Sequence, residues 1–316
     1  MQDERIIGQY IGKEKGPLLI AFGSMHGNEP AGKTALATMF EMLDKEPLKN
    51  PDFQFRGQLL GLIGNLRATN AQQRFIDRDL NRHWTVENVQ RVKAAAIESL
   101  SAEDAELREN IALIEQIIAE YQPEQIVVLD MHTTTAFGGI FTIATDDEKS
   151  VDIGIQLHAP VITGMLRGLK GTSLHYFCTQ NLGVPTTAIC FESGQHNEPL
   201  SVNRAIAALT NCMRTIGCVD ASHIENRHDA LLVEYSKGLP QVSELLMVHS
   251  IQAGDDFKMN PGYKNFQTVR QGEVLARDRH GDITAVADGA ILMPLYQQQG
   301  EDGFFLVQPL DHNTAK

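Results

Sequence analysis

Two histidines and a glutamate lie where strands are expected to end, and their side chains suit a metal ion. His26 and Glu29 follow an apolar run, residues 17–22, that is typical of a buried strand. On the loop leaving this strand, an imidazole nitrogen and a carboxylate oxygen can point at one position, as a catalytic zinc with two His and one Glu ligand requires. A polar loop between a strand and a helix would contain the same residues, so this stretch alone leaves both interpretations open.

The third candidate ligand is His132, at the end of a second apolar run that begins at residue 125. Asp130 lies two residues earlier, where its carboxylate can accept a hydrogen bond from the other imidazole nitrogen and so orient the ring. The sequence therefore predicts one zinc ion per chain, bound by His26, Glu29 and His132. Three protein ligands leave the fourth tetrahedral position open for water, which is the arrangement of a catalytic zinc site.

A third apolar run, residues 186–191, ends at Glu192. Open α/β sheets place their ligand crevice at the carboxyl ends of the strands, so Glu192 is expected beside the metal site. A fourth protein ligand would close the site, and we interpret Glu192 as a general base that takes a proton from the water molecule. The alternative role is a carboxylate that stabilises the start of the following helix.

Four motifs occur together in a recognisable order. They are Gly23-Ser-Met-His-Gly-Asn-Glu29, Asp79-Leu-Asn-Arg82, Leu129-Asp-Met-His132 and Phe191-Glu-Ser-Gly194. In order and rough spacing they resemble the succinylglutamate desuccinylase/aspartoacylase family, whose catalytic domain is related to the zinc carboxypeptidases. The resemblance covers most of the chain and implies a zinc-dependent hydrolase that cleaves the amide bond of an N-acyl amino acid, a deacylase.

The resemblance also assigns roles in the charged stretch from residue 65 to residue 84, which by itself could be solvated surface. Arg74 matches the position of a residue that polarises the scissile carbonyl, and Asn81 and Arg82 match positions that hold a substrate carboxylate. A guanidinium suits this task because its N–H groups match a carboxylate two-pronged. Tyr176 matches a substrate-binding tyrosine, but the arginine that accompanies it in the aspartoacylases is missing, so an acidic substrate side chain is not implied.

Tyr296 is a further candidate in the carboxyl-terminal part, either as a hydroxyl donor that reaches the substrate or as an aromatic residue packed at the rim. Histidines outside the motifs, among them His196, we interpret as surface or packing residues. Two other functions use the same ligands: a zinc carboxypeptidase acting on short peptides, and a metal-binding protein without turnover. An intact Glu192 argues against the second, because a binding protein needs no base beside its metal.

The periodicity predicts the elements that position these residues. Apolar strands and helical stripes alternate, which predicts an α/β fold with a mostly parallel or mixed central sheet flanked by helices, as in the zinc carboxypeptidases. Strands are expected at 4–11, 17–23, 58–64, 125–132, 139–144 and 186–191, and helices at 30–44, 87–100, 102–120, 149–158 and 196–213.

The composition changes from about residue 219. Residues 250–309 contain short apolar runs between glycine-rich turns, which predicts an all-β lobe resembling the barrel of biotinyl and lipoyl carrier domains. The modified lysine of such a carrier is missing, because no lysine occurs from residue 265 until Lys316. We therefore divide the chain into a catalytic α/β domain, residues 1–218, and a crossover with a β lobe, residues 219–316.

Charge and composition narrow the partners. The formal charge of −13 argues against nucleic acid, because no net basic field is available to neutralise phosphates. No apolar run approaches the roughly 20 residues needed to cross a membrane, and the first residues do not resemble a leader, which favours a cytoplasmic protein. The four cysteines show no metal-binding spacing and are expected to be reduced. The expected partner is a small N-acyl amino acid, and the sequence leaves open whether the chain forms a homo-oligomer.

Overall fold

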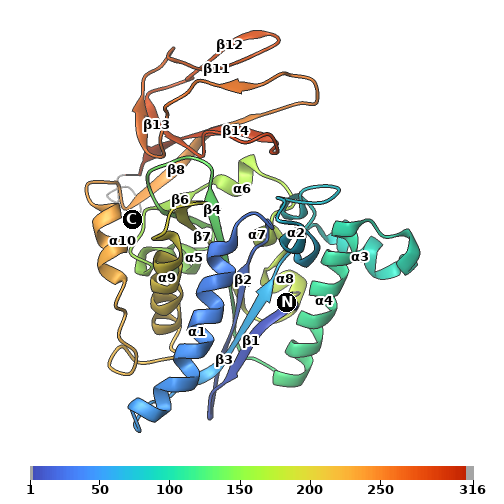
Figure 1. Cartoon of the computed structure of the whole chain (residues 1–316), viewed down its shortest axis with the longest axis vertical. Coiled ribbons are helices and arrows are strands. Elements are labelled where there is room, and N and C mark those ends of the chain that lie inside the picture. The colour runs from blue at the N-terminus through green and yellow to red at the C-terminus, as the bar shows by residue number, and fades with distance from the viewer. Residues whose placement is uncertain (1–2, 311–316) are drawn as a thin grey trace.

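A mixed sheet of eleven strands forms the centre of the molecule (Figure 1). The computed structural model describes residues 3–310. The strand order is β1-β3-β2-β4-β7-β5-β6-β8-β14-β13-β10. The strands are β1 (Ile6–Ile11), β2 (Glu14–Gly23), β3 (Arg56–Ile63), β4 (Ile126–Thr134), β5 (Phe141–Ala144), β6 (Val161–Thr163), β7 (Thr186–Gln195), β8 (Val242–Ser250), β10 (Gln267–Val269), β13 (Gly289–Leu292) and β14 (Asp302–Pro309).

Helices cover both faces of this sheet (Figure 1). They are α1 (Pro30–Lys49), α2 (Leu66–Ala71), α3 (Val86–Ala94), α4 (Ala102–Tyr121), α5 (Glu148–Gln156), α6 (Met165–Gly168), α7 (Ser173–Tyr176), α8 (Thr179–Leu182), α9 (Ser201–Thr215) and α10 (Asp229–Ser236). Two short 3₁₀ turns, η1 (Leu80–Arg82) and η2 (Ile97–Ser99), complete the set in the described residues. The predicted α/β fold with a mixed sheet flanked by helices is confirmed.

Burial on both faces explains why the central strands are continuously apolar. In β2, Leu18, Ile20 and Phe22 enter the core on one face of the sheet, while Leu19 and Ala21 enter the core on the other. Successive side chains of a strand point to opposite faces, so a strand covered on both sides needs apolar residues at every position. All residues of β4 are buried for the same reason.

The three central strands are parallel and in register at the end where the motifs lie. β2 pairs with β4, and β4 pairs with β7, so that Phe22 lies beside Asp130 and His132 lies beside Glu192. The loops and strand ends that carry the candidate ligands and the candidate base therefore meet at one edge of the sheet.

Three predicted helices have clearly different bounds in the structure. The helix expected over 30–44 continues to Lys49, with Pro47 inside its last turns. The helix expected over 87–100 ends at Ala94, and Ile97 in the following 3₁₀ turn is 71% exposed, so no apolar face continues the helix. The helix expected to begin at His196 begins at Ser201, because β7 continues to Gln195 and a turn follows.

The carboxyl-terminal segment extends the central sheet and adds a second one. β8 pairs in parallel with β6, and β14 and β13 continue outward from it. A separate three-stranded sheet contains β12 (Gly281–Thr284), β11 (Val274–Asp278) and β9 (Lys258–Met259). The described part between residues 250 and 309 contains no helix. Since the large sheet runs through both predicted lobes, the boundary at residue 218 stays a prediction.

Candidate metal centre and active site

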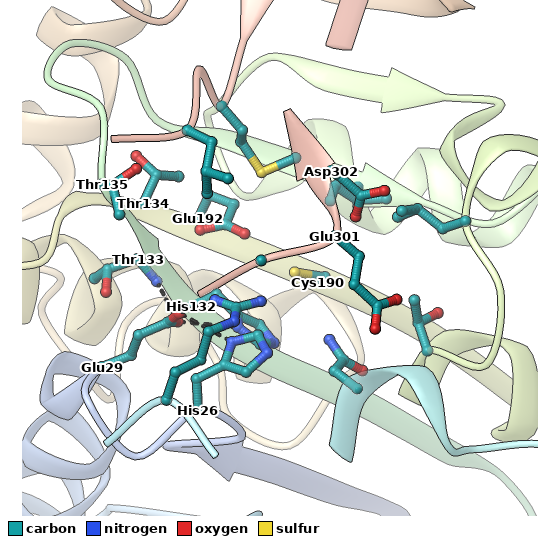
Figure 2. Close-up of a pocket in the computed structure, with 18 of the residues that line it drawn as sticks. His26, Glu29, His132, Thr133, Thr134, Thr135, Cys190, Glu192, Glu301 and Asp302 are labelled. Carbon is teal, nitrogen blue, oxygen red and sulfur yellow. Dashed lines mark hydrogen bonds and ion pairs between the residues drawn. The ribbon is translucent and has the colours of Figure 1, made fainter. Parts of the chain in front are cut away.

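A cavity opens at the carboxyl ends of β2, β4 and β7 (Figure 2). The three metal ligands and the base that were predicted from the sequence, Arg74 and the two predicted carboxylate-binding residues all line this cavity. Apolar side chains and residues of the carboxyl-terminal segment complete the lining. The lining includes His26, Glu29, Arg74, Asn81, Arg82, His132, Glu192, Ile143, Leu166, Leu174, Met293, Leu295, Glu301, Asp302 and Phe305.

The three predicted metal ligands converge on one point. His26 Nδ1 lies 2.9 Å from Glu29 Oε1, and His132 Nδ1 lies 3.0 Å from Glu29 Oε2. The three residues are buried, and their ligand atoms all lie within 4.8 Å of one another. Figure 2 shows the two imidazole rings and the carboxylate facing the same space. Two nitrogen donors and one oxygen donor at this separation fit a zinc ion.

The loop between β2 and α1 has the shape that this convergence needs. Ser24 adopts a positive φ of 56°, and its hydroxyl donates a hydrogen bond to the carbonyl oxygen of Glu29. The backbone of Gly27 passes so close to Ala68 that a Cβ at position 27 would lie 2.1 Å from the Ala68 carbonyl carbon. Only glycine permits this approach, which turns His26 and Glu29 toward the same point.

Both imidazoles are oriented by a carboxylate on their far side. His132 Nε2 lies 3.1 Å from Asp130 Oδ1, and Asp130 also accepts a hydrogen bond from the Ser173 hydroxyl. His26 Nε2 lies 3.0 Å from Asp79 Oδ1. Since the Nε2 atoms face these carboxylates, the Nδ1 atoms are left to face the metal position. Sequence reasoning identified Asp130 but missed the role of Asp79, although Asp79 begins the Asp79–Arg82 motif.

The charges of the cluster stabilise one another. Burial acts to raise the pKa of the Glu29 carboxyl, but the neighbouring His26 and His132 outweigh it and hold that pKa well below its ordinary value. Burial similarly opposes ionisation of Asp79, yet Arg74 and His26 keep the pKa of its carboxyl well below the ordinary range. A carboxylate that stays ionised is the form that can bind a metal or orient a ligand.

Glu192 lies beside the metal ligands without contacting them through a hydrogen bond. As register partners on parallel strands, His132 and Glu192 project from the same face of the sheet. Glu192 is 6% exposed, its Oε2 atom has no hydrogen-bond partner in the described chain, and it lines the cavity (Figure 2). Burial raises the pKa of its carboxyl to about 8. Burial of this kind is common among acid–base groups of active sites, and the role of Glu192 as the base stays a prediction.

Arg74 reaches the cavity from the loop after α2, and Arg82 reaches it from the 3₁₀ turn η1 that follows this loop. Arg74 Nη1 lies 3.4 Å from Glu29 Oε1, and its Nη2 donates to Asp79 Oδ2 at 2.9 Å. Arg82 donates through Nη1 to the carbonyl oxygen of Asn81 and through Nη2 to Asp302. Burial opposes the charge on Arg82, but Asp79 and Asp302 outweigh burial and raise the pKa of the guanidinium.

Glu103, a buried residue of α4, forms hydrogen bonds with the backbone of this loop. The Glu103 carboxylate accepts hydrogen bonds from the backbone N–H groups of Ile76, Asp77 and Arg78 at 2.7, 2.9 and 3.2 Å. It also accepts one from the side-chain amide of Asn65. These contacts fix the backbone that carries Arg74 and the residues from Asp79 to Arg82.

The two tyrosines proposed from the sequence lie outside the lining of the cavity. Tyr176, in α7, packs its ring against Trp84 and Phe177. The Tyr296 hydroxyl donates to the carbonyl oxygen of Asn260 and accepts from the backbone N–H of Tyr263, within the carboxyl-terminal segment. Neither hydroxyl group is directed at the metal ligands, and a role for either residue in substrate binding stays a prediction.

Three residues of the lining with acidic or imidazole side chains were not assigned to the site from the sequence. His196, interpreted as a packing residue, lines the cavity, and its Nδ1 lies 2.6 Å from the Thr133 hydroxyl. It follows Glu192 by four residues at the end of the same strand, which is the signal that could have identified it. Glu301 and Asp302 enter the cavity from the start of β14 (Figure 2). No local pattern connects them with the motifs of the first 200 residues.

Comparison with known proteins agrees with this architecture. Residues 15–214 match the model of the succinylglutamate desuccinylase/aspartoacylase catalytic domain. A "Probable aspartoacylase" from Nostoc sp. is 33% identical over 121 residues, which span 38% of this chain and 36% of that protein. The chain thus matches little more than a third of the length of this relative.

Solved structures extend the similarity to nearly the whole chain. A succinylglutamate desuccinylase from Vibrio cholerae superposes with a TM-score of 0.65 at 18% identity, covering 93% of this chain and 82% of the other. A succinylglutamate desuccinylase/aspartoacylase from Rhodobacter sphaeroides superposes with a TM-score of 0.61 at 13% identity, covering 94% and 87%. At these identities the two comparisons establish a common fold. None of the described helices is long and apolar enough to cross a membrane.

Proposed function

The chain belongs to the succinylglutamate desuccinylase/aspartoacylase family, and on that premise we propose that it is a zinc-dependent hydrolase cleaving the amide bond of an N-acyl amino acid. The observation that carries the proposal is the pairing, on adjacent strands, of a buried His26–Glu29–His132 cluster with the buried carboxyl of Glu192, which has a free oxygen atom. A metal position with a base beside it suits hydrolysis, whereas simple metal storage would not need the base.

Each residue of the cavity has a task in this reaction. His26, Glu29 and His132 would hold one zinc ion, with Asp79 and Asp130 orienting the two rings. Zinc, when bound, supplies a positive charge that activates water near neutral pH and favours the ionised form of nearby carboxyls. Glu192 accepts a proton from the attacking water, whose oxygen forms a bond to the carbonyl carbon of the amide.

Cleavage of the C–N bond and protonation of the amine complete the reaction. As the C–O bond forms, negative charge develops on the carbonyl oxygen of the substrate. Arg74 lies beside the metal ligand Glu29, and from there it can donate an N–H group to this oxygen. The C–N bond then breaks, and protonated Glu192 gives its proton to the departing amine. Asn81 and Arg82 hold the carboxylate of the amino acid. The products are a carboxylate and a free amino acid.

The cover over the cavity supports a small substrate. Met293, Leu295 and Gln297 of the carboxyl-terminal segment line the cavity, and Gln297 Oε1 accepts a hydrogen bond at 3.4 Å from the side chain of Asn28, which lies between His26 and Glu29 in the chain. A long peptide chain would have to displace this segment. The cover therefore favours the deacylase over the carboxypeptidase considered above.

The proposal is tested by zinc content and amide hydrolysis. We expect one zinc per chain and hydrolysis of N-acetyl amino acids, with dipeptides poor substrates and long peptides inert. Replacing His132 with Ala should empty the site. A protein that binds zinc but hydrolyses none of a broad panel of N-acyl amino acids would refute the proposed activity, and a faster reaction with peptides would favour the carboxypeptidase.

The role of Glu192 has its own test. Glu192→Gln keeps the shape of the side chain and removes the proton acceptor, so we expect full zinc occupancy and a loss in kcat on the order of a hundredfold or more. If Glu192 were a metal ligand, the variant would lose zinc instead. A variant that retains zinc and turns over within a few-fold of the unmodified enzyme would rule out the mechanism.

A further inference from the structure

Two consecutive carboxylates enter the cavity from the carboxyl-terminal segment. Asp302 is the first residue of β14 and Glu301 precedes it, and both side chains line the cavity that also contains the metal ligands (Figure 2). Asp302 forms an ion pair with Arg82, whereas the Glu301 carboxylate forms no hydrogen bond or ion pair with any residue of the described chain. Glu301 is exposed at the rim of the cavity, so its unpaired carboxylate is accessible to a ligand.

The positive charges of the cavity are already matched. Among the described lining residues the guanidinium groups are those of Arg74 and Arg82. Arg74 pairs with Glu29 and Asp79, and Arg82 pairs with Asp302. An acidic side chain of a substrate would therefore find no unpaired cation of the protein, and it would approach Glu301 at the same time.

The unpartnered carboxyl of Glu192 belongs to the metal position rather than to the side chain of the substrate. Glu192 is nine-tenths buried and lies beside His132, where a bound zinc would add positive charge. Beside Glu301 the unpaired carboxylate favours a cation and opposes a second anion.

Arg82 can still hold the single carboxylate that every N-acyl amino acid has. Its Nη1 donates to the carbonyl oxygen of Asn81 and its Nη2 to Asp302. A guanidinium has five N–H donors, so others remain for a substrate carboxylate. The ion pair with Asp302 keeps the Arg82 guanidinium in position. It also neutralises the positive charge that would otherwise attract a second carboxylate of a substrate.

We propose that Glu301 selects substrates by charge, and that the natural substrate is the N-acyl derivative of an amino acid with a cationic side chain. The inference rests on the proposed deacylase function and adds the substrate class. The carboxylate of the substrate binds Arg82, and its side-chain ammonium group approaches Glu301. Leu166, Leu174 and Phe305 are apolar residues of the same lining and suit the methylene groups of such a side chain.

The test compares three substrates with the zinc-loaded full chain. Nα-acetyl-lysine carries the cation, Nα-acetyl-norleucine has a similar stem without charge, and Nα-acetyl-glutamate carries a second carboxylate. We expect kcat/KM for acetyl-lysine to exceed that for acetyl-norleucine by about tenfold or more, since opposite charges about 4 Å apart in a partly solvated site interact by more than 1 kcal/mol. Acetyl-glutamate should be the poorest of the three.

Variants of Glu301 test whether this residue causes the preference for acetyl-lysine. Glu301→Gln should bring acetyl-lysine and acetyl-norleucine within about twofold of each other, and Glu301→Lys should reverse the preference toward acetyl-glutamate. Glu98→Gln, which removes an exposed carboxylate far from the cavity, should behave like the unmodified enzyme. An unchanged acetyl-lysine preference in Glu301→Gln, or a preference of the unmodified enzyme for acetyl-glutamate, would overturn the proposal.

Failure of the deacylase activity itself gives a different result. If none of the three compounds is hydrolysed, the proposed function has failed, and calorimetric binding of the same compounds to the zinc-loaded protein still tests the charge preference. Tighter binding of acetyl-lysine that Glu301→Gln abolishes supports the selection. Equal binding of all three compounds, or unchanged binding in Glu301→Gln, contradicts it.

Discussion

Glu103 is the residue whose replacement tests most directly how the fold supports the site. Its carboxylate is completely buried and accepts hydrogen bonds from three consecutive backbone N–H groups, those of residues 76–78, and from Asn65. We expect that Glu103→Ala lowers the free energy of unfolding and loosens the loop that carries Arg74 and Arg82.

The contacts set the size of the effect. A hydrogen bond to a charged group contributes about 1.5–3 kcal/mol net. The donors of the loop are only partly buried, so water can replace some of the lost bonds, and we take the lower end for the three backbone bonds. At about 1.5 kcal/mol for each of the three bonds, the expected loss is about 4.5 kcal/mol. Glu103→Gln retains one carbonyl oxygen as acceptor and should lose about half as much.

Urea unfolding measures the stability, and amide hydrogen exchange measures the loop. The amides of Ile76, Asp77 and Arg78 should exchange faster in Glu103→Ala, and kcat/KM should fall because Arg74 and Arg82 lose their fixed positions. Glu120→Ala, an exposed position on the same helix, is the matched control. The reasoning would be refuted if Glu103→Ala were no less stable than Glu120→Ala, or if the three amides kept their exchange rates.

Two other substitutions give independent predictions. Asp79→Asn removes the carboxylate charge that orients His26, whose Nε2 lies 3.0 Å from Asp79 Oδ1. A chelator competition should show zinc binding weakened about tenfold to a hundredfold. Asp77→Asn is the control, and equal losses in the two variants would contradict the role of Asp79. The hydrogen bond from Arg91 lowers the pKa of Asp104 from its ordinary value of 3.8 to about 2. A carboxyl with a lowered pKa stabilises the fold above its unfolded-state pKa, and the gain is lost as the pH falls from about 4 toward 2. Arg91→Ala should therefore cost up to about 1 kcal/mol at pH 7 and less at pH 3 in urea unfolding, since Arg91 is half-exposed; a loss independent of pH would contradict it.

The sequence by itself determined the strands and the identity of the residues at their ends. Residues 17–22 are apolar at every position, and residues 186–191 contain only threonine besides apolar residues, a pattern that a strand covered on both faces requires. The carboxyl ends of parallel strands lie at one edge of a sheet, so His132 and Glu192 could be assigned to one site before the fold was known. The order of the four motifs along the chain supported the same assignment, because it resembles the order in the family.

The sequence was less informative where an element ends without a strong local signal. Val89 and Val92 give the helix after residue 86 one buried stripe, and nothing in the next six residues distinguishes a further helical turn from an extended segment. His196 was misjudged for a related reason. Whether a histidine four residues beyond Glu192 lines a cavity depends on where the strand stops, which the composition does not define.

Only the tertiary structure decided which distant groups meet. Arg82 and Asp302 are 220 residues apart in the chain, and Glu103 reaches a loop 25 to 27 residues before it. Hydrogen bonds and ion pairs of this kind depend on the three-dimensional path of the backbone, whereas periodicity reports only whether a residue faces the core or the solvent. The ligands of the metal site could therefore be predicted from local patterns, but the acidic side of the cavity, formed by Glu301 and Asp302, could not.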